Sequence, residues 1–406
     1  MATITYRNFQ LEIEDPVIVS QTGTYEDLGW GPWQFPGLFA TDKGNILCTW
    51  NVGVDSVAGY EESLDGHLFG GMVTEDGGKT WRKRLLSDRE KGPLMSNGKE
   101  YFCADMHNAF VPSWLEKYTP AMVGKQSGTA VYAPGSVPEY SQVLRPKEYD
   151  PETGLTTEFE AKVNWPHHGM HCCNHEGVLH VYPFENLMGH LGYTLPDGEG
   201  GLFLFNYSYG YSAQTGILHT ADAYNVYVFH SGDCGRTWNW ISEVLTTDDY
   251  FINDPHWEGF CEPGACKMPD GSYVMLMRTG GGLPSYLTRS TDNCRTWSKP
   301  VVFDRVGVFP RIMTLGCGVT LSAYGRPGVF LRATDDPSGL SWEAPVDLDV
   351  GSDTGRNASE LITCSYTALY PLSDTDALLV YSHYKYPNAD GIPVKTILSR
   401  RIHIKK

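Results

Sequence analysis

The chain has 406 residues, of which 41% are hydrophobic and 13% aromatic, which is enough to bury a large core in a single domain spanning residues 1–406. Its 48 acidic and 31 basic residues give a formal charge of −17, which argues against nucleic acid as a partner because phosphate binding needs a concentrated basic surface. The N-terminus lacks a secretory pattern and no apolar run reaches membrane-spanning length, so we expect a cytoplasmic protein that does not bind membranes.

A short phrase ending in tryptophan recurs along the chain. It reads Thr-Glu-Asp-Gly-Gly-Lys-Thr-Trp at 74–81, Ser-Gly-Asp-Cys-Gly-Arg-Thr-Trp at 231–238 and Ser-Thr-Asp-Asn-Cys-Arg-Thr-Trp at 290–297. A degenerate copy at 333–342 has Asp335 as its expected aspartate. An aspartate among small residues closes a tight turn by side-chain-to-backbone hydrogen bonds, and the tryptophan offers an apolar anchor. The β-rich runs before these phrases predict that each turn joins the outer strands of a four-stranded unit.

A second recurring phrase is a turn followed by a short apolar strand. It occurs at 42–48, 176–181, 270–275, 316–321 and 374–380. These segments have the pattern of hairpin strands, and the chain shows no sustained helical period. Repeats at this spacing are typical of propeller blades. The sequence therefore predicts an all-β fold, a six-bladed β-propeller, with seven blades as the alternative.

The tryptophan phrase resembles the Asp-box, or BNR repeat, of the sialidase superfamily, and the resemblance covers most of the chain. It implies a six-bladed propeller with an active site at the centre of one face, a carbohydrate substrate and no cofactor. Asp-boxes are specific for the fold and not for the reaction, because binding proteins and lyases use the same propellers.

The resemblance also implies individual roles. Glu262 and Arg278 lie in a stretch, 261–278, that looks like the family segment in which a glutamate precedes a hairpin ending in a substrate-binding arginine. Arg326 is similar to a later substrate-binding arginine, and Tyr366 matches the nucleophile. A glutamate beside a tyrosine accepts the phenolic proton, and an arginine presents a planar fork of donors to a carboxylate. The alternatives are a surface ion pair for Glu262 and Arg278 and a core position for Tyr366.

The family places an acid/base aspartate in the loop before the first Asp-box. That loop contains Asp55, Glu61, Glu62 and Asp65. We favour Asp65, since it directly precedes the strand expected at 67–73, whose rigid edge can hold its carboxyl group. A solvated loop carboxylate is the alternative.

The first blade departs from the family pattern. The family's Phe-Arg-Ile-Pro motif is replaced here by a segment beginning Trp33-Gln34, so Gln34 stands where the first substrate-binding arginine is expected. A neutral amide donates hydrogen bonds but carries no charge, which leaves at most two cations to bind a sugar carboxylate. We expect a retaining exo-glycosidase for a terminal sugar, acidic by preference, that is bound by Arg278, Arg326, Gln34 and Trp33.

Histidines motivate a second hypothesis. The segment 166–175, expected to be a loop, holds four histidines and two cysteines, but its spacing matches no closed zinc motif, and we expect no metal. His107, His168 and His171 are instead candidates for a polysaccharide lyase acting on a uronate, in which a histidine or tyrosine removes the proton α to the carboxylate.

A third hypothesis is a non-catalytic carbohydrate-binding propeller. Aromatic rings stack on sugar faces, although aromatic residues this frequent are more often in the core. The candidates for such stacking are Trp30, Trp33, Trp50 and Tyr60.

Overall fold

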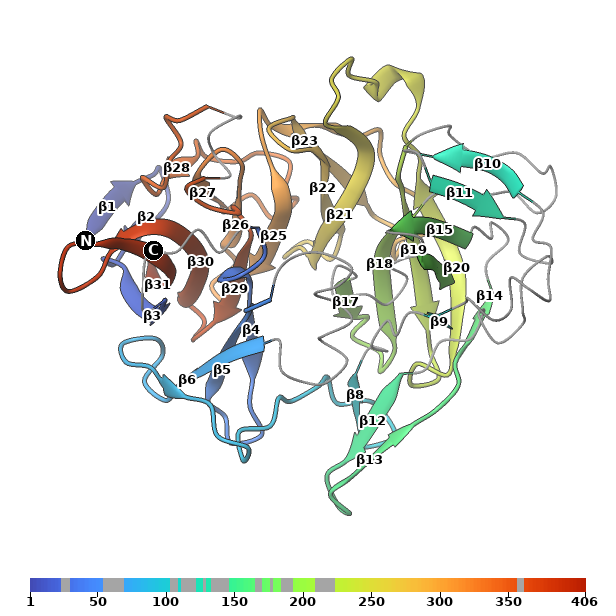
Figure 1. Ribbon diagram of the computed structural model, residues 1–406, viewed down its shortest axis with the longest axis horizontal. Coiled ribbons are helices and arrows are strands. Elements are labelled where there is room, and N and C mark those ends of the chain that lie inside the picture. The colour runs from blue at the N-terminus through green and yellow to red at the C-terminus, as the bar shows by residue number, and fades with distance from the viewer. Residues whose placement is uncertain are drawn as a thin grey trace.

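Strands make up nearly all of the regular structure in the computed structural model (Figure 1). It describes residues 1–22, 30–53, 69–102, 109–110, 122–126, 129–132, 146–164, 170–175, 178–183, 193–208, 223–355 and 361–406. Across these residues there are 31 strands and one short 3-10 helix, η3 (Asp248–Tyr250). None of the described residues forms a helix with the length and apolar character needed to cross a bilayer.

Six of the sheets are the blades of a propeller, which confirms the predicted fold class and the lower blade number. Blade 1 contains β4 (Gln34–Ala40), β5 (Ile46–Asn51), β6 (Phe69–Thr74) and β7 (Arg82–Lys83). Blade 2 contains β9 (Ala109–Phe110), β16 (Val178–Pro183), β15 (Met170–His175), β11 (Thr129–Tyr132) and β10 (Met122–Gln126). Blade 3 contains β17 (Tyr193–Pro196), β18 (Leu202–Ser208), β19 (Asn225–Ser231), β20 (Thr237–Val244) and β14 (Lys162–Asn164).

The remaining blades follow in chain order. Blade 4 contains β21 (Trp257–Lys267), β22 (Tyr273–Gly280), β23 (Ser285–Ser290) and β24 (Val301–Asp304). Blade 5 contains β25 (Val308–Thr314), β26 (Thr320–Gly325), β27 (Val329–Thr334) and β28 (Val346–Asp347). A small separate sheet joins β8 (Glu100–Phe102), β12 (Lys147–Asp150) and β13 (Leu155–Glu158).

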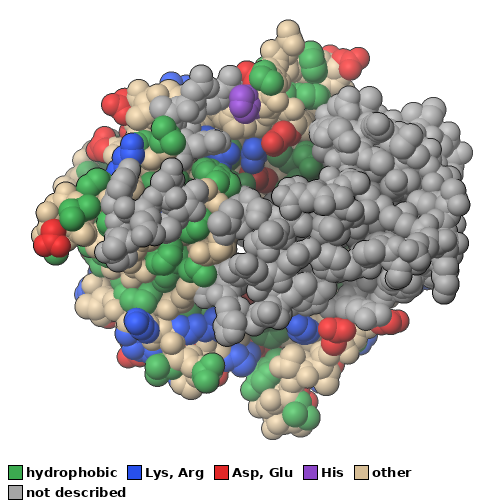
Figure 2. Space-filling model, viewed as in Figure 1, with side chains coloured by type: hydrophobic (Ala, Val, Ile, Leu, Met, Phe, Trp, Pro, Cys, Tyr) green, Lys and Arg blue, Asp and Glu red, His purple; other side chains and the backbone are tan. Residues whose placement is uncertain are grey.

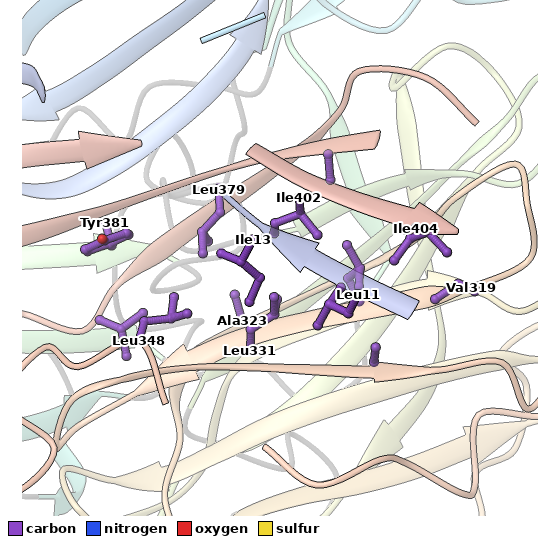
Figure 3. Packing of buried hydrophobic residues seen from close by; sticks show 14 of the residues in the cluster. Leu11, Ile13, Val319, Ala323, Leu331, Leu348, Leu379, Tyr381, Ile402 and Ile404 are labelled. Atoms are coloured by element: carbon purple, nitrogen blue, oxygen red, sulfur yellow. The ribbon is translucent and has the colours of Figure 1, made fainter. Parts of the chain in front are cut away.

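Blade 6 closes the ring with both ends of the chain. It combines β29 (Thr367–Pro371), β30 (Asp376–Pro387) and β31 (Pro393–Lys405) with β1 (Ala2–Thr5), β2 (Gln10–Ile13) and β3 (Val17–Gln21). β2 and β3 both pair with β31, and the two termini lie close together (Figure 1). Figure 3 shows the core behind this closure, where Leu11, Ile13 and Ile402 pack with Leu331 and Leu379. Burying each of these aliphatic side chains stabilises the fold by about 1.5–3 kcal/mol.

The five predicted turn-and-strand segments are all second strands of blades. They correspond to β5, β16, β22, β26 and β30. Each such strand has hydrogen-bonded neighbours on both sides, which explains why these segments are short apolar runs with polar turns before them.

The recurring aspartate turns join the third and fourth strands of blades 1, 3, 4 and 5, as the sequence predicts. In the turn of blade 4, the Asp292 carboxylate accepts hydrogen bonds from the backbone N–H groups of Arg295 (3.1 Å) and Thr296 (2.9 Å). Ser290, two residues earlier, accepts from the N–H of Cys294 at 3.0 Å. The Trp297 indole reaches the neighbouring blade and donates to Ser242 Oγ at 3.0 Å, so the turn also fixes one blade to the next.

Three expectations need correction. In the degenerate copy Asp336, and not Asp335, accepts from the backbone amides of the turn, while Asp335 binds the side chain of Asn8. Residues 170–175 form strand β15 and not a loop. Trp50 is 3% exposed and packs in the core between blades 1 and 6, which leaves its ring no free face for a sugar.

Cysteine side chains in the described part of the chain are free thiols, with no disulfide among them. The seven described in this way are Cys48, Cys234, Cys261, Cys266, Cys294, Cys317 and Cys364.

Candidate active site

The first strands of blades 1, 4 and 5 share one local distortion. In each strand, a residue followed by proline has a positive φ angle: 54° at Phe35, 46° at Glu262 and 41° at Phe309. At these same places the pairing between the first and second strands shifts register, as in a β-bulge. Such bulges redirect side chains, and the left-handed backbone costs about 1–3 kcal/mol per residue. The fold therefore stores strain at one equivalent position in three blades.

These distorted strands converge on Tyr366. It directly precedes β29 of blade 6, follows Ser365 with φ 62°, and is 7% exposed. Its ring stacks on Phe309 with centroids 4.6 Å apart and an interplanar angle of 14°. Phe35 meets the same ring edge-on at 5.0 Å. Two of the bulges thus hold the phenol in one orientation.

The third bulge supplies the polar partner of the phenol. The Tyr366 hydroxyl donates a hydrogen bond to Oε1 of Glu262, which is 3% exposed. The other carboxylate oxygen, Oε2, accepts from the backbone N–H of Phe309 at 2.8 Å. Arg278 Nη1 lies 2.7 Å from Glu262 Oε1 and 3.3 Å from the Tyr366 hydroxyl. Both oxygens of this buried carboxylate are therefore satisfied, and its charge is balanced by a cation.

Glu262 and Arg278 come together because their strands pair. Cys261 in β21 lies opposite Arg278 in β22, so the hairpin predicted from 261–278 places both side chains at one end of blade 4. Glu258, earlier in β21, meets the other side of the guanidinium, with Oε2 3.0 Å from Arg278 Nη2. Figure 2 shows acidic and basic side chains side by side in a hollow on this face of the molecule.

Burial and nearby charge determine the protonation of the cluster. Burial and the negative charge of Glu262 raise the pKa of Tyr366 well above its usual value, although Arg278 and Arg326 act in the opposite direction. Burial alone would lower the pKa of Arg278, but the carboxylates of Glu262 and Glu258 raise it well above the usual value. At neutral pH the phenol therefore keeps its proton and the guanidinium stays charged.

Arg326 approaches the same phenol from blade 5. It follows β26 with φ 69°, is 6% exposed, and donates from Nη2 to the carbonyl of Cys364 at 2.9 Å. Its guanidinium carbon lies 5.8 Å from the centroid of the Tyr366 ring and 5.4 Å from that of Trp30. The structure thus brings together four of the predicted site residues: Tyr366, Glu262, Arg278 and Arg326.

Gln34 begins β4, beside Phe35. It is completely buried, and neither its amide nitrogen nor its amide oxygen has a hydrogen-bond partner in the described part of the chain. An unsatisfied buried polar group costs about 1–3 kcal/mol. Trp33, on the other side of Gln34, packs instead towards the core between blades 1 and 6 and donates from its indole to Ser20 Oγ at 3.3 Å.

For the remaining predicted site residues the side chains are not described. Asp65, His107 and His168 lie outside the described residues, as do Asp55, Tyr60, Glu61 and Glu62. His171 lies in β15 of blade 2, and its side chain is not described. Within the described ranges, no group of three or more histidine, cysteine, aspartate or glutamate side chains is arranged to hold a metal ion.

No family model matches the chain, and no curated protein sequence matches it. Among solved structures, it is similar to a protein of unknown function from Dyadobacter fermentans DSM 18053, with 15% identity, a TM-score of 0.61, and coverage of 97% of this chain and 99% of that one. At this identity the likeness shows a shared fold. The fold is a six-bladed β-propeller.

Two further solved structures match with lower TM-scores. One is the GH93 α-L-arabinofuranosidase of Fusarium graminearum in complex with arabinobiose, with 12% identity, a TM-score of 0.49, and coverage of 95% of this chain and 97% of that one. The other is the K499G mutant of NanB sialidase from Streptococcus pneumoniae, with 11% identity, a TM-score of 0.47, and coverage of 95% and 70%.

Sequence reasoning missed three contributors to the cluster around Tyr366. Phe35 and Phe309 were not singled out, although the repeated pairs Phe35-Pro36, Glu262-Pro263 and Phe309-Pro310 were a usable signal. Glu258 carried no such signal, because its contact with Arg278 depends on how β21 is distorted.

Proposed function

We propose that this propeller is a retaining glycoside hydrolase that releases a terminal sugar, acidic by preference, with Tyr366 as the nucleophile. The observation that carries the proposal is the buried hydrogen bond from the Tyr366 phenol to Glu262. A phenol with a raised pKa is a weak nucleophile unless a base removes its proton as it attacks, and Glu262 is in contact with that proton.

In the first step, the Tyr366 oxygen attacks the anomeric carbon while Glu262 takes the phenolic proton. The glycosidic bond breaks, and the leaving oxygen needs a proton from a general acid. We assign this role to Asp65 on the family resemblance. In the second step, water attacks the glycosyl-tyrosine and gives a proton to Asp65, while the phenolate leaves and takes its proton back from Glu262. Two displacements at one carbon retain its configuration.

A tyrosine nucleophile suits a substrate with a negative group at the anomeric centre. A neutral phenol meets less electrostatic repulsion on approach than a carboxylate nucleophile would. Arg278 and Arg326 flank the Tyr366 ring and are proposed to bind that negative group. Gln34 adds an amide donor where the family pattern has a third cation, so we expect weaker dependence on substrate charge than a three-arginine site would have.

The test is a product analysis in water enriched in ¹⁸O. The protein is incubated with sialosides, other terminal acidic glycosides and uronate-containing oligosaccharides, and products are identified by mass spectrometry. Release of a sugar carrying one ¹⁸O supports the hydrolase. An unsaturated uronate that absorbs in the ultraviolet and carries no ¹⁸O would establish the lyase hypothesis instead. Saturable binding without any product would leave the carbohydrate-binding propeller.

A further inference from the structure

Arg278 is held between two carboxylates that differ in their access to solvent. Its Nη1 contacts Glu262, whose side chain is 3% exposed, while its Nη2 contacts Glu258, whose side chain is 38% exposed. Glu258 binds this nitrogen through both oxygens, at 3.0 Å and 3.2 Å. Solvent exposure therefore falls from Glu258 through Arg278 to Glu262.

We propose that Glu258 is a specificity-determining residue that occupies, on Arg278 Nη2, the position an acidic substituent of the substrate would take. The inference rests on the proposed function, in which Arg278 binds the negative group of the sugar. A ligand carboxylate reaches this nitrogen only by displacing a carboxylate already hydrogen-bonded to it. Because one charge-assisted hydrogen bond replaces another, the net gain in affinity at Arg278 is small.

The surroundings of Glu258 allow the side chain to leave while the backbone stays. The carbonyl of Glu258 accepts a hydrogen bond from the N–H of Tyr224 at 2.7 Å, and the next residue, Gly259, has φ 81° and packs against the Tyr224 backbone. Among the described residues, the carboxylate accepts one further hydrogen bond, from the thiol of Cys261 at 3.5 Å. Displacement therefore needs a rotation of the half-exposed side chain only.

This arrangement predicts selectivity among ligands. An acidic sugar loses part of its binding energy to the displacement of Glu258, whereas a neutral sugar that avoids Arg278 Nη2 loses none. Glu258 and the uncharged Gln34 therefore weaken the preference for anionic ligands that Arg278 and Arg326 alone would produce.

The test uses the Glu258→Gln variant and acetate, which is the carboxylate group alone. Acetate is titrated into wild type and variant at constant ionic strength, and binding is followed by the ¹⁵N–¹H signal of Arg278 Nε, a buried group without a hydrogen-bond partner in the described ranges. Glutamine keeps the size and an acceptor oxygen but removes the competing charge. We expect the half-saturating acetate concentration to fall roughly tenfold, equivalent to about 1.4 kcal/mol.

Asp249→Asn is the matched control, because it removes the same charge from an exposed acid whose ion pair is with Lys299 and not with Arg278. It should leave acetate binding unchanged. Glu258→Ala, which removes the side chain entirely, should strengthen acetate binding at least as much as Glu258→Gln. Equal or weaker acetate binding by both Glu258 variants, or no binding by any of the proteins, would overturn the proposal. The titration involves no turnover, so its failure is distinct from that of the hydrolase, which would show as no product from wild type.

Discussion

The phenol of Tyr366 donates a hydrogen bond to the carboxylate of Glu262, a residue 104 positions earlier in the chain and two blades away in the ring. The contact exists because the first strands of three blades are distorted at the same place, which brings Phe35, Glu262 and Phe309 around one ring. Strained backbone held in place by its surroundings is typical of functional sites, and here it holds the Glu262 carboxylate against the Tyr366 phenol, the pair that we propose as base and nucleophile.

Tyr366→Phe removes the hydroxyl and leaves the ring packing between Phe35 and Phe309 in place. We expect kcat on any glycoside that wild type hydrolyses to fall by at least about a thousandfold, because no nucleophile remains. Tyr384→Phe is the matched control, since Tyr384 is a buried tyrosine of the same cluster with no proposed role in the reaction. Steady-state kinetics on both variants distinguish the roles, and a Tyr366→Phe enzyme with wild-type kcat would contradict the assignment.

Gln34→Met replaces an unsatisfied buried amide by an apolar side chain of similar length. We expect the free energy of unfolding, measured with urea, to rise by about 1–2 kcal/mol, because a donor and an acceptor no longer lack partners. KM for the substrate should rise several-fold if the amide binds sugar. Gln21→Met is the control, since the Gln21 amide donates to Pro387 O and Thr396 Oγ1, and its loss should lower stability. A destabilised Gln34→Met protein would show that this amide is satisfied in solution.

Asp336→Ala and Asp335→Ala test which aspartate builds the turn of blade 5. Asp336 accepts from the N–H groups of Ser338, Leu340 and Ser341, at 2.9, 3.1 and 2.9 Å, whereas Asp335 accepts from Asn8 at an exposed position. We expect urea unfolding to show a loss of about 1–3 kcal/mol for Asp336→Ala and less than about 0.5 kcal/mol for Asp335→Ala. The opposite ranking would restore the assignment made from the sequence.

The turn of blade 4 should weaken in acid. Hydrogen bonds from the Thr296 hydroxyl and backbone lower the pKa of Asp292 to about 2, below its value in an unfolded chain of about 3.9. A depressed folded-state pKa gives stability that is present above pH 4 and is lost as the pH falls towards 2. The difference in unfolding free energy between wild type and Asp292→Asn should therefore be constant from pH 7 to 5 and shrink between pH 4 and 2. A difference that grows in acid would refute this linkage.

The fold could be predicted from the sequence because its repeats are local. Each aspartate turn and each apolar second strand is coded within about eight residues, and their recurrence indicates the propeller. The sequence also held a signal for the aspartate that was assigned wrongly in the degenerate copy. The aspartate always stands two residues after a serine or threonine, as in Ser231 and Asp233, and the same rule gives Thr334 and Asp336.

The site was predictable only in part. Glu262, Arg278, Arg326 and Tyr366 were reached through a family resemblance, and the structure brings all four together. The aromatic pair around Tyr366 and the second carboxylate on Arg278 depend on bulges that place residues from different blades within a few ångströms of one another. Strand patterns determine which residues face a core, but not where a ladder slips by one residue.

The most direct test of the central claim is to trap the glycosyl-enzyme. The probe is a glycoside of a sugar that wild type releases, with fluorine beside the anomeric carbon and a good leaving group. The fluorine slows both displacements because it destabilises the oxocarbenium-like transition states, while the good leaving group keeps the first displacement fast. Peptide mass spectrometry of the inactivated protein should then find one added sugar on the peptide that contains Tyr366, and none in Tyr366→Phe. A sugar attached to another residue, or rapid turnover without any covalent adduct, would contradict the account.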